Sequence, residues 1–465
     1  MATPPRASRP SGAPDSVDGM LDATPAPFDT PAGRIVGTVD GDVVRVLGVP
    51  YARAERFAPP EPMPPSADEL HATTPSPVAP QPQAQFVDAL LDPVEGIEVD
   101  EHCQRLSITL PADLAPDERL PVMVWIHGGS YVIGGGDLPI YDARELVTEQ
   151  RVIVVSVTFR LGVLGFLGDG RTIPANLGLL DLVESLRWVR ANIAAFGGDP
   201  DLVTVFGQSA GGDAAAHLMI SAGARGLFRR AIIQSAPLGL SRRRARMNRA
   251  MVRAVGAVHA DTPLDDLLER QQAGTRAAAP YGLAGGMPFG TQYGFAPLPA
   301  ERDLDVAWSS IAPEVDVLIG SATDETGMYV PLIPGLRRIA RSRVLRPALR
   351  WWIVRPLSDV IYGRDVRRFT ARHRRAGGRA TSYRLVRGVT TKPTGAVHMS
   401  DLPLLLGGRQ AWAGTRFVPE RDWPEVERRG RAFRAVWAGF ARTGEVTAPD
   451  DETLTFDRDP GVRAP

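Results

Sequence analysis

Residues 203–212 read Val-Thr-Val-Phe-Gly-Gln-Ser-Ala-Gly-Gly and contain the pattern Gly-x-Ser-x-Gly, with Ser209 at its centre. The apolar run before the pattern predicts a strand, and the small residues after it predict the start of a helix. A strand-to-helix turn this tight leaves no room for side chains beside the serine, so glycines flank it and the serine is held exposed in strained geometry. The bare pattern is weak, but in this context it predicts a nucleophilic serine.

Short apolar runs alternate with helical patterns on both sides of this turn. Near-continuous apolar runs are typical of strands buried on both faces of a sheet, and they occur at Val122–Ile126, Val152–Val157, Val203–Phe206, Arg230–Gln234 and Val315–Ile319. Helical patterns occur at Leu177–Asn192, Ala210–Ser221 and Pro424–Thr443. The alternation predicts an α/β fold with a mostly parallel central sheet covered by helices. An N-terminal hairpin is expected at Arg34–Val39 and Val43–Val49, joined by Asp40-Gly41.

Length and composition set broad limits on the molecule. The chain has 465 residues, of which 44% are hydrophobic, and its formal net charge is zero. The neutral balance gives no electrostatic argument for nucleic acid or for an acidic partner. No run approaches the ~18 apolar residues of a membrane span, the N-terminus lacks a secretory apolar region, and the single Cys103 excludes an intrachain disulfide. These features favour a cytoplasmic protein without stable membrane anchoring.

A basic segment stands out in the C-terminal third of the chain. Residues 337–379 contain fourteen arginines against Asp359 and Asp365, interleaved with Trp351 and Trp352. One interpretation is a solvated helical surface on which arginine stems cover apolar neighbours. The other is a basic amphipathic element near the mouth of the site that meets anionic lipid or an acidic substrate. The composition favours the first interpretation and leaves the second open.

A second glycine-rich turn accompanies the serine. His127-Gly-Gly-Ser-Tyr131 follows the predicted strand Val122–Ile126. Consecutive glycines after a strand let backbone N–H groups turn towards a substrate carbonyl, and donors fixed in this way stabilise a tetrahedral intermediate. The candidate donors are the backbone N–H groups of Gly129 and Ser130, completed by that of Ala210.

A serine hydroxyl needs a base to take its proton, and the base needs an acid to orient it. Of the seven histidines, only His259, His373 and His398 follow the serine at any distance. The arginines beside His373 would hinder its protonation during catalysis, and His259 comes too early to leave room for a further strand and acid. The candidate base is therefore His398, in a loop that follows the predicted strand Ser382–Val386.

The best carboxylates lie just beyond the predicted strand Val315–Ile319. Asp324 and Glu325 stand next to each other there, and both satisfy the chemistry. The pattern by itself does not choose between them.

These motifs, in this order, resemble the type-B carboxylesterase family, the cholinesterase-like branch of the α/β-hydrolases. The resemblance covers roughly residues 33–450. It rests on the nucleophile turn and on further blocks at Gly48–Ala52, Arg56–Pro60, Glu101–Leu106, Asn176–Asp181 with Trp188, Phe196–Pro200 and Trp437–Gly444.

The resemblance implies a fold and an activity. It implies a single α/β-hydrolase domain over residues 33–450 and hydrolysis of small carboxylic esters through an acyl-enzyme, without metal or organic cofactor. It makes Glu325 the acid and His398 the base of a triad with Ser209. It also implies two structural ion pairs, Arg56–Glu101 and Arg160–Asp181. The same residues would equally serve a carbamate, lactone or amide hydrolase, and a non-catalytic binding relative is a remote alternative.

The sequence departs from the family at several positions. Ser130 replaces the third glycine of the oxyanion loop, which changes its local shape while keeping the N–H. Gln208 stands where many relatives place a glutamate, so the site is expected to lack a nearby second carboxylate. No tryptophan occurs between residues 58 and 124, where cholinesterases carry their choline-binding indole, so choline esters are not expected.

The ends of the chain and the segment before the candidate base are also unusual. The short interval between Glu325 and His398 indicates a trimmed helical cap, expected at residues 327–380. Residues 1–32 are rich in proline, alanine, serine and aspartate, which predicts a disordered tail. Residues 451–465 are expected to form a loose C-terminal tail.

Overall fold

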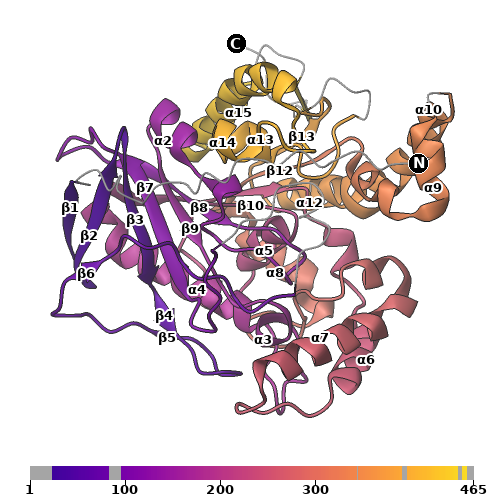
Figure 1. Cartoon of the computed structure of the whole chain (residues 1–465), viewed down its shortest axis with the longest axis horizontal. Coiled ribbons are helices and arrows are strands. Elements are labelled where there is room, and N and C mark those ends of the chain that lie inside the picture. The colour runs from indigo at the N-terminus through magenta and orange to yellow at the C-terminus, as the bar shows by residue number, and fades with distance from the viewer. Residues whose placement is uncertain (1–23, 83–95, 343, 390–394, 449–452, 458–465) are drawn as a thin grey trace, which may run out of the picture.

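One large mixed sheet runs through the described part of the chain (Figure 1). The computed structural model describes residues 24–82, 96–342, 344–389, 395–448 and 453–457. Its strands are β1 (Pro25–Thr30), β2 (Gly33–Asp40), β3 (Val43–Pro50), β4 (Ala52–Arg53), β5 (Glu61–Pro62), β6 (Leu70–His71), β7 (Arg105–Pro111), β8 (Leu120–Ile126), β9 (Ile153–Val157), β10 (Gly198–Gln208), β11 (Arg230–Gln234), β12 (Asp316–Ala322), β13 (Ala380–Leu385) and β14 (Leu454–Asp457).

The sheet combines a parallel centre with antiparallel edges. Among the described residues its order is β1-β2-β3-β7-β9-β8-β10-β11-β12-β13-β14, with β6 beside β2, while β4 and β5 pair separately. Neighbouring strands from β9 to β13 in this order run parallel. The pairs at the two edges run antiparallel, including the predicted hairpin of β2 and β3. The α/β-hydrolase fold with a mostly parallel central sheet is therefore confirmed.

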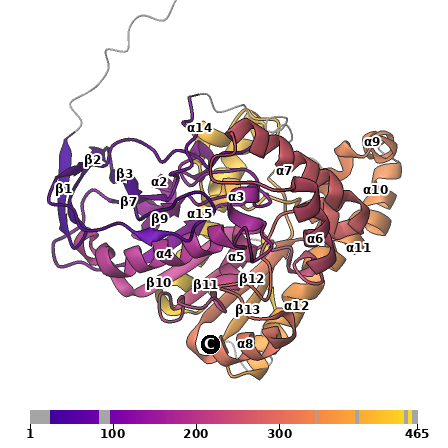
Figure 2. The same cartoon turned by 90° about the horizontal axis from the view of Figure 1, so that it is seen from below.

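Helices cover both faces of the sheet and also build a separate region beyond its end (Figures 1 and 2). The α-helices are α2 (Arg144–Gln150), α3 (Gly162–Phe166), α4 (Leu177–Asn192), α5 (Ala210–Leu218), α6 (Ala245–Val255), α7 (Leu264–Ala278), α8 (Leu304–Ile311), α9 (Pro334–Arg341), α10 (Leu345–Leu349), α11 (Arg355–Ser358), α12 (Arg364–Arg375), α13 (Leu402–Leu405), α14 (Gly408–Trp412) and α15 (Trp423–Thr443). Each of the predicted central strands and each of the three predicted helices overlaps an observed element of the same type.

Two apolar cores follow from the period of two along the strands. On β8, Val122, Val124 and Ile126 point into the core that packs under α4, α5, α8 and α12. The alternate residues Met123 and Trp125 point into the opposite core, which packs under α2, α13 and α15. Because successive strand side chains leave the sheet on opposite faces, a continuously apolar strand needs a cover on both sides.

Both expected tails contain a strand at their inner end. The tail predicted for residues 1–32 overlaps β1, which pairs antiparallel with β2 and packs Phe28 against Phe196. Proline is tolerated there because an edge strand leaves half of its N–H groups without a ladder partner. The tail predicted for residues 451–465 overlaps β14, which pairs with β13 and buries Leu454. Pairing with a distant strand orders these two stretches, and the composition of the stretches themselves does not reveal that pairing. The rest of the two tails lies outside the described residues.

The segment predicted as a cap is helical for most of its length. It contains α9 to α12, joined through two π-helical turns, η8 (Arg350–Val354) and η9 (Asp359–Gly363). The helix α12 packs on β12 and β13 and belongs to the layer that covers the sheet. By contrast, α9 and α10 project from the edge of the molecule in both views (Figures 1 and 2).

Candidate active site

The turn between β10 and α5 holds Ser209 in a strained backbone conformation. Its φ is 59° and its ψ is −123°, outside the regions that L-residues ordinarily occupy. A Cβ added at Gly207 would lie 2.5 Å from the carbonyl carbon of Gly211, and one added at Gly211 would lie 1.9 Å from the carbonyl oxygen of Ile126. The two flanking glycines are therefore required by close backbone contacts, and they leave the side chain of Ser209 at the end of the central strand.

The side chains of Ser209, His398 and Glu325 form one hydrogen-bonded chain. His398 Nε2 lies 2.9 Å from Ser209 Oγ, and His398 Nδ1 lies 2.5 Å from Glu325 Oε2. Glu325 is fully buried and His398 is 3% exposed. The three residues follow β10, β12 and β13, whose carboxyl ends meet at one edge of the parallel sheet.

The structure separates the two adjacent carboxylates that the sequence left open. Glu325 faces His398 with one oxygen and accepts the N–H of Ala322 at 2.6 Å with the other. Asp324 points elsewhere and accepts from Arg350 Nε at 2.7 Å and Arg350 Nη2 at 2.8 Å. Adjacent residues diverge here because the chain turns directly after β12, so that Glu325 begins a 3-10 helix.

The candidate oxyanion donors lie in the loop after β8 and at the start of α5. Among the described residues, no hydrogen bond is formed by the backbone N–H groups of Gly129, Ser130 or Ala210. The loop that carries the first two follows β8, and Gly129 adopts φ 109° with the carbonyl oxygen of Ile133 only 1.9 Å from where a Cβ would stand. Ser130 keeps the left-handed backbone of a glycine, with φ 56°. The substitution therefore leaves the N–H in place at a strain of about 1 kcal/mol.

A buried network that sequence reasoning missed ties this loop to α5, the helix that follows Ser209. Asp213, four residues after the serine on α5, accepts the hydroxyls of Tyr131 at 2.7 Å and Ser241 at 2.6 Å. Burial alone would raise the pKa of Asp213, but nearby His217 and the hydroxyl donors outweigh it and lower that pKa. The ionised carboxylate thus fixes Tyr131, the residue directly after Ser130. A lone carboxylate among the small residues of a predicted buried helix, Ala210–Ala216, was the signal that could have found it.

The expectation that the site lacks a nearby second carboxylate rests on Gln208 in place of a glutamate. Gln208 lies beside His398, with its amide nitrogen 3.4 Å from His398 Nε2. However, Asp401, three residues after His398, is buried within electrostatic reach of the imidazole. Burial raises the pKa of Asp401 to about 6, against the hydrogen bond at 2.7 Å that it accepts from Gln234. Asp401 is thus a buried carboxylate in the loop after His398, and its hydrogen bond goes to Gln234.

Two tyrosine rings flank the imidazole, and sequence reasoning did not single them out. The ring centroid of Tyr362 lies 5.5 Å from that of His398, and the ring centroid of Tyr329 lies 6.1 Å from it. Burial raises the pKa of Tyr329 to about 12, so its phenol stays protonated. Both tyrosines come from the helical segment before β13, so they form part of the wall around His398.

The two ion pairs implied by the family resemblance are present and lie apart from the serine. Arg160 binds the carboxylate of Asp181 through Nε at 2.9 Å and Nη2 at 2.7 Å, and both side chains are buried. Arg56 binds Glu101 through two nitrogens, one of them at 2.7 Å. Both pairs join distant parts of the chain and serve the architecture.

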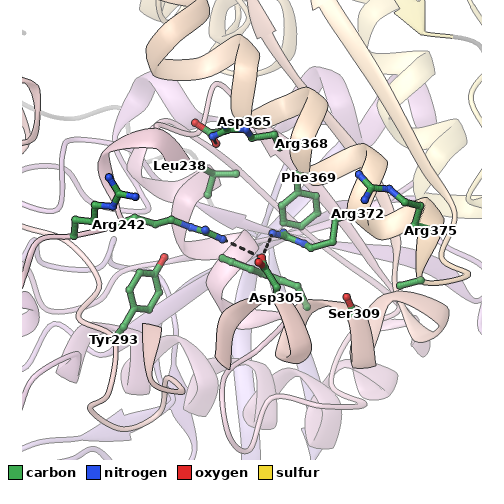
Figure 3. A pocket seen from close by; sticks show the side chains of 13 residues that line it. Leu238, Arg242, Tyr293, Asp305, Ser309, Asp365, Arg368, Phe369, Arg372 and Arg375 are labelled. Atoms are coloured by element: carbon green, nitrogen blue, oxygen red, sulfur yellow. Dashed lines mark hydrogen bonds and ion pairs between the residues drawn. The ribbon is translucent and has the colours of Figure 1, made fainter. Parts of the chain in front are cut away.

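A separate open cavity of about 850 Å³ lies between α8 and α12 (Figure 3). Five arginines line it, and Arg242 and Arg372 both reach the carboxylate of Asp305 at 3.2 Å. Neither Ser209 nor His398 lines it.

Among the described residues, no group of three or more histidines, cysteines or acids is arranged to hold a metal ion, and no helix is long and apolar enough to cross a membrane.

Comparison with known proteins identifies the family of this chain. The model of the Carboxylesterase family matches residues 25–344. A protein of Rhodococcus erythropolis described as a probable N-octanoylanthranilate hydrolase is 34% identical over 90% of this chain and 93% of its own length. Para-nitrobenzyl esterase of Bacillus subtilis is 43% identical, over 44% of this chain and 42% of its own length.

Solved structures agree with this result. A thermophilic para-nitrobenzyl esterase superimposes with a TM-score of 0.74 at 26% identity, covering 94% of this chain and 98% of its own. The carboxylesterase Est55 of Geobacillus stearothermophilus gives a TM-score of 0.71 at 27% identity, covering 93% and 98%. The fold and site therefore define an α/β-hydrolase, and the chain belongs to the carboxylesterase family. It is a carboxylic ester hydrolase.

Proposed function

We propose that Ser209, His398 and Glu325 form a catalytic triad that hydrolyses small carboxylic esters through an acyl-enzyme. The observation that carries this proposal is the unbroken hydrogen-bonded chain from Ser209 Oγ through the imidazole to the buried carboxylate. The buried Glu325 holds the proton of His398 on Nδ1, which leaves Nε2 free to accept the proton of the serine.

The first half of the reaction forms the acyl-enzyme. His398 Nε2 takes the hydroxyl proton of Ser209 while Oγ attacks the ester carbonyl, giving a tetrahedral oxyanion. The N–H groups of Gly129, Ser130 and Ala210 donate to this oxyanion, and removal of one such donor typically costs ~10²–10³ in rate. The intermediate collapses when the imidazolium returns the proton to the leaving alcohol.

The second half reverses these roles with water. His398 takes a proton from water, the resulting hydroxide attacks the acyl carbonyl, and the same donors hold the second oxyanion. The imidazolium then protonates Ser209 Oγ, which releases the carboxylic acid and restores the free enzyme. The Tyr131–Asp213 contact keeps the oxyanion loop at a fixed position relative to the serine during both halves.

A second candidate function is hydrolysis of an N-acyl aromatic amide by the same residues. The relative that spans nearly the whole chain is described as a probable N-octanoylanthranilate hydrolase, and such a substrate carries an amide bond. The leaving amine would need the proton of the His398 imidazolium, as the alcohol does. Side-by-side rates on p-nitrophenyl octanoate and N-octanoylanthranilate distinguish an esterase from an amidase.

The test of the triad is the Ser209→Ala variant. Turnover of p-nitrophenyl butyrate should fall by about 10⁶, because loss of the nucleophile in a triad has a cost of this order. Covalent labelling by a fluorophosphonate probe should disappear, while the Ser130→Ala variant, one loop away, should label as the wild type does. Equal labelling of the Ser209→Ala variant would refute the assignment.

A further inference from the structure

The helical segment that projects from the molecule exposes an unusual amount of apolar surface. Val344 is 83% exposed, Leu345 52%, Trp351 61% and Trp352 82%. We call these four residues the tryptophan patch. Large apolar side chains scattered singly on a surface are ordinary, but a contiguous group marks a surface that meets another phase or partner.

The tryptophan patch lies along one short helical stretch. Val344 and Leu345 stand at the start of α10, and Trp351 and Trp352 lie in the π-helical turn η8 that continues it. The buried residues of the same segment, Leu349 among them, face the small inner core beside α9. The segment is thus amphipathic, with an apolar face turned away from the protein.

The charge around the tryptophan patch has one sign. Residues 329–358 contain seven arginines and no acidic residue. Arg337, Arg338 and Arg341 lie on the neighbouring helix α9, and in the part of the chain that the structure describes no carboxylate pairs with them. Their positive charge is therefore free to meet a partner.

The same segment is anchored on the loop of the proposed triad acid. Arg350 and Arg355 bind the buried carboxylate of Asp324, the neighbour of Glu325. Farther along the same segment, ten residues beyond Trp352, Tyr362 lies against His398. A surface that receives the tryptophan patch would therefore hold the enzyme close to its proposed catalytic base.

We propose that the tryptophan patch and the arginines of α9 form a docking surface for anionic phospholipid bilayers. Tryptophan and arginine are the side chains suited to the headgroup region, where an apolar ring enters the interface and a guanidinium pairs with phosphate. A contact between two copies of this chain through the same face would bring the arginines of both copies together, which like-charge repulsion opposes. The proposed docking is peripheral and should be reversed by salt, because it rests on interfacial side chains and on exposed charges.

Sedimentation with lipid vesicles tests the proposal. The full-length protein should pellet with vesicles of phosphatidylcholine and phosphatidylglycerol in equal parts, remain in solution with pure phosphatidylcholine, and dissociate as salt is raised. The triple variant with Arg337, Arg338 and Arg341 changed to glutamine should partition about a hundredfold more weakly, since each arginine near an anionic surface contributes about fivefold.

A matched control removes the same charge elsewhere. Arg246, Arg249 and Arg253 are exposed on α6, and changing all three to glutamine should leave partitioning within about threefold of the wild type. All variants should hydrolyse a water-soluble ester at the wild-type rate without vesicles, because none of these arginines touches the proposed triad. Equal losses in the two triple variants would overturn the proposal in favour of a simple net-charge effect.

The apolar half of the surface is tested separately. The Trp351→Ala, Trp352→Ala double variant should weaken partitioning to vesicles at least tenfold. Trp352→Ala alone is a second variant, because the side chain of Trp352 makes little contact with the rest of the fold. Wild-type protein that stays in solution with anionic vesicles would refute the proposal. A wild-type dimer that the double variant converts to a monomer, measured by light scattering, would also refute it and identify the face as a contact between copies.

Discussion

Changing Glu325 to glutamine tests how the proposed triad sets the tautomer of its base. In the wild type, Glu325 Oε2 accepts from His398 Nδ1 and Oε1 accepts the N–H of Ala322. In the variant, the amide oxygen should accept the hydrogen bond from the N–H of Ala322, because this N–H can only donate and the amide NH₂ cannot accept. The amide NH₂ then faces Nδ1 and can only donate to it. His398 must therefore carry its proton on Nε2, the nitrogen that has to accept the proton of the serine.

The expected loss of kcat is about 10⁴, the size that follows when a triad histidine is held in the wrong tautomer. This corresponds to about 5.5 kcal/mol of lost transition-state stabilisation. The side chains have the same shape, so the free energy of unfolding should change by much less. The assay is steady-state hydrolysis of p-nitrophenyl butyrate, with urea denaturation of the same samples.

Asp324→Asn is the matched control, one residue away and equally buried. It weakens the ion pairs with Arg350 and Arg355. Both arginines are partly exposed, so their guanidinium groups can be hydrated instead. We expect a loss of about 1–2 kcal/mol in stability and a kcat within tenfold of the wild type. A Glu325→Gln enzyme that keeps more than a tenth of wild-type kcat, or an Asp324→Asn enzyme that loses more than a thousandfold, would refute the reasoning.

Three further changes probe the surroundings of the site. Asp401 has a folded-state pKa of about 6, above its unfolded value of about 3.9, so its contribution to stability is complete only below about pH 3 and is lost as the pH rises through 6. Asp401→Asn, which can still accept from Gln234, should remove a pH-dependent loss of about 3 kcal/mol, measured as the difference between the free energies of unfolding in urea at pH 3 and pH 8 relative to wild type. Ser130→Gly should keep kcat within threefold, because only the backbone N–H of this residue is used. It should also add up to about 1 kcal/mol of stability, because the strain of the left-handed backbone is relieved. A large loss of kcat would show that the hydroxyl matters. Gly211→Ala should lower the free energy of unfolding by about 3 kcal/mol or more and reduce the yield of soluble enzyme, because the new Cβ would overlap the carbonyl oxygen of Ile126. A normal thermal midpoint would contradict the close backbone approach in this turn.

The parts of the fold that sequence reasoning predicted share a local cause. The parallel strands are continuously apolar, and α4 and α15 are long and strongly patterned, so their type is encoded within each segment. The edges of the sheet were harder to predict. Residues Pro25–Thr30 and Leu454–Asp457 carry few strand signals of their own, and they are ordered by pairing with β2 and β13. Pairing of this kind depends on a partner far away in the sequence, which local composition cannot report.

The residues of the candidate site also divide into those that the local sequence predicts and those that only tertiary packing places. Glycines at 207 and 211 are required by backbone contacts within one turn, so the pattern around Ser209 already indicated a nucleophile. The chain order of serine, acid and histidine narrowed the base to His398. The direction of each carboxylate was not encoded locally, because Asp324 and Glu325 are adjacent and chemically alike. Only the turn after β12 sends one to the imidazole and the other to Arg350.

The sequence by itself determined the chemistry offered by this protein: a serine between two glycines, a glycine pair after a strand, and a histidine in a late loop. The tertiary structure alone decided which groups support that chemistry. Asp213 and Asp401 acquire their roles from burial and from neighbours such as Tyr131 and Gln234, which long-range packing brings together. The tryptophan patch became visible in the same way, since periodicity predicts an apolar helix face, whereas solvent exposure is a property of the whole folded chain.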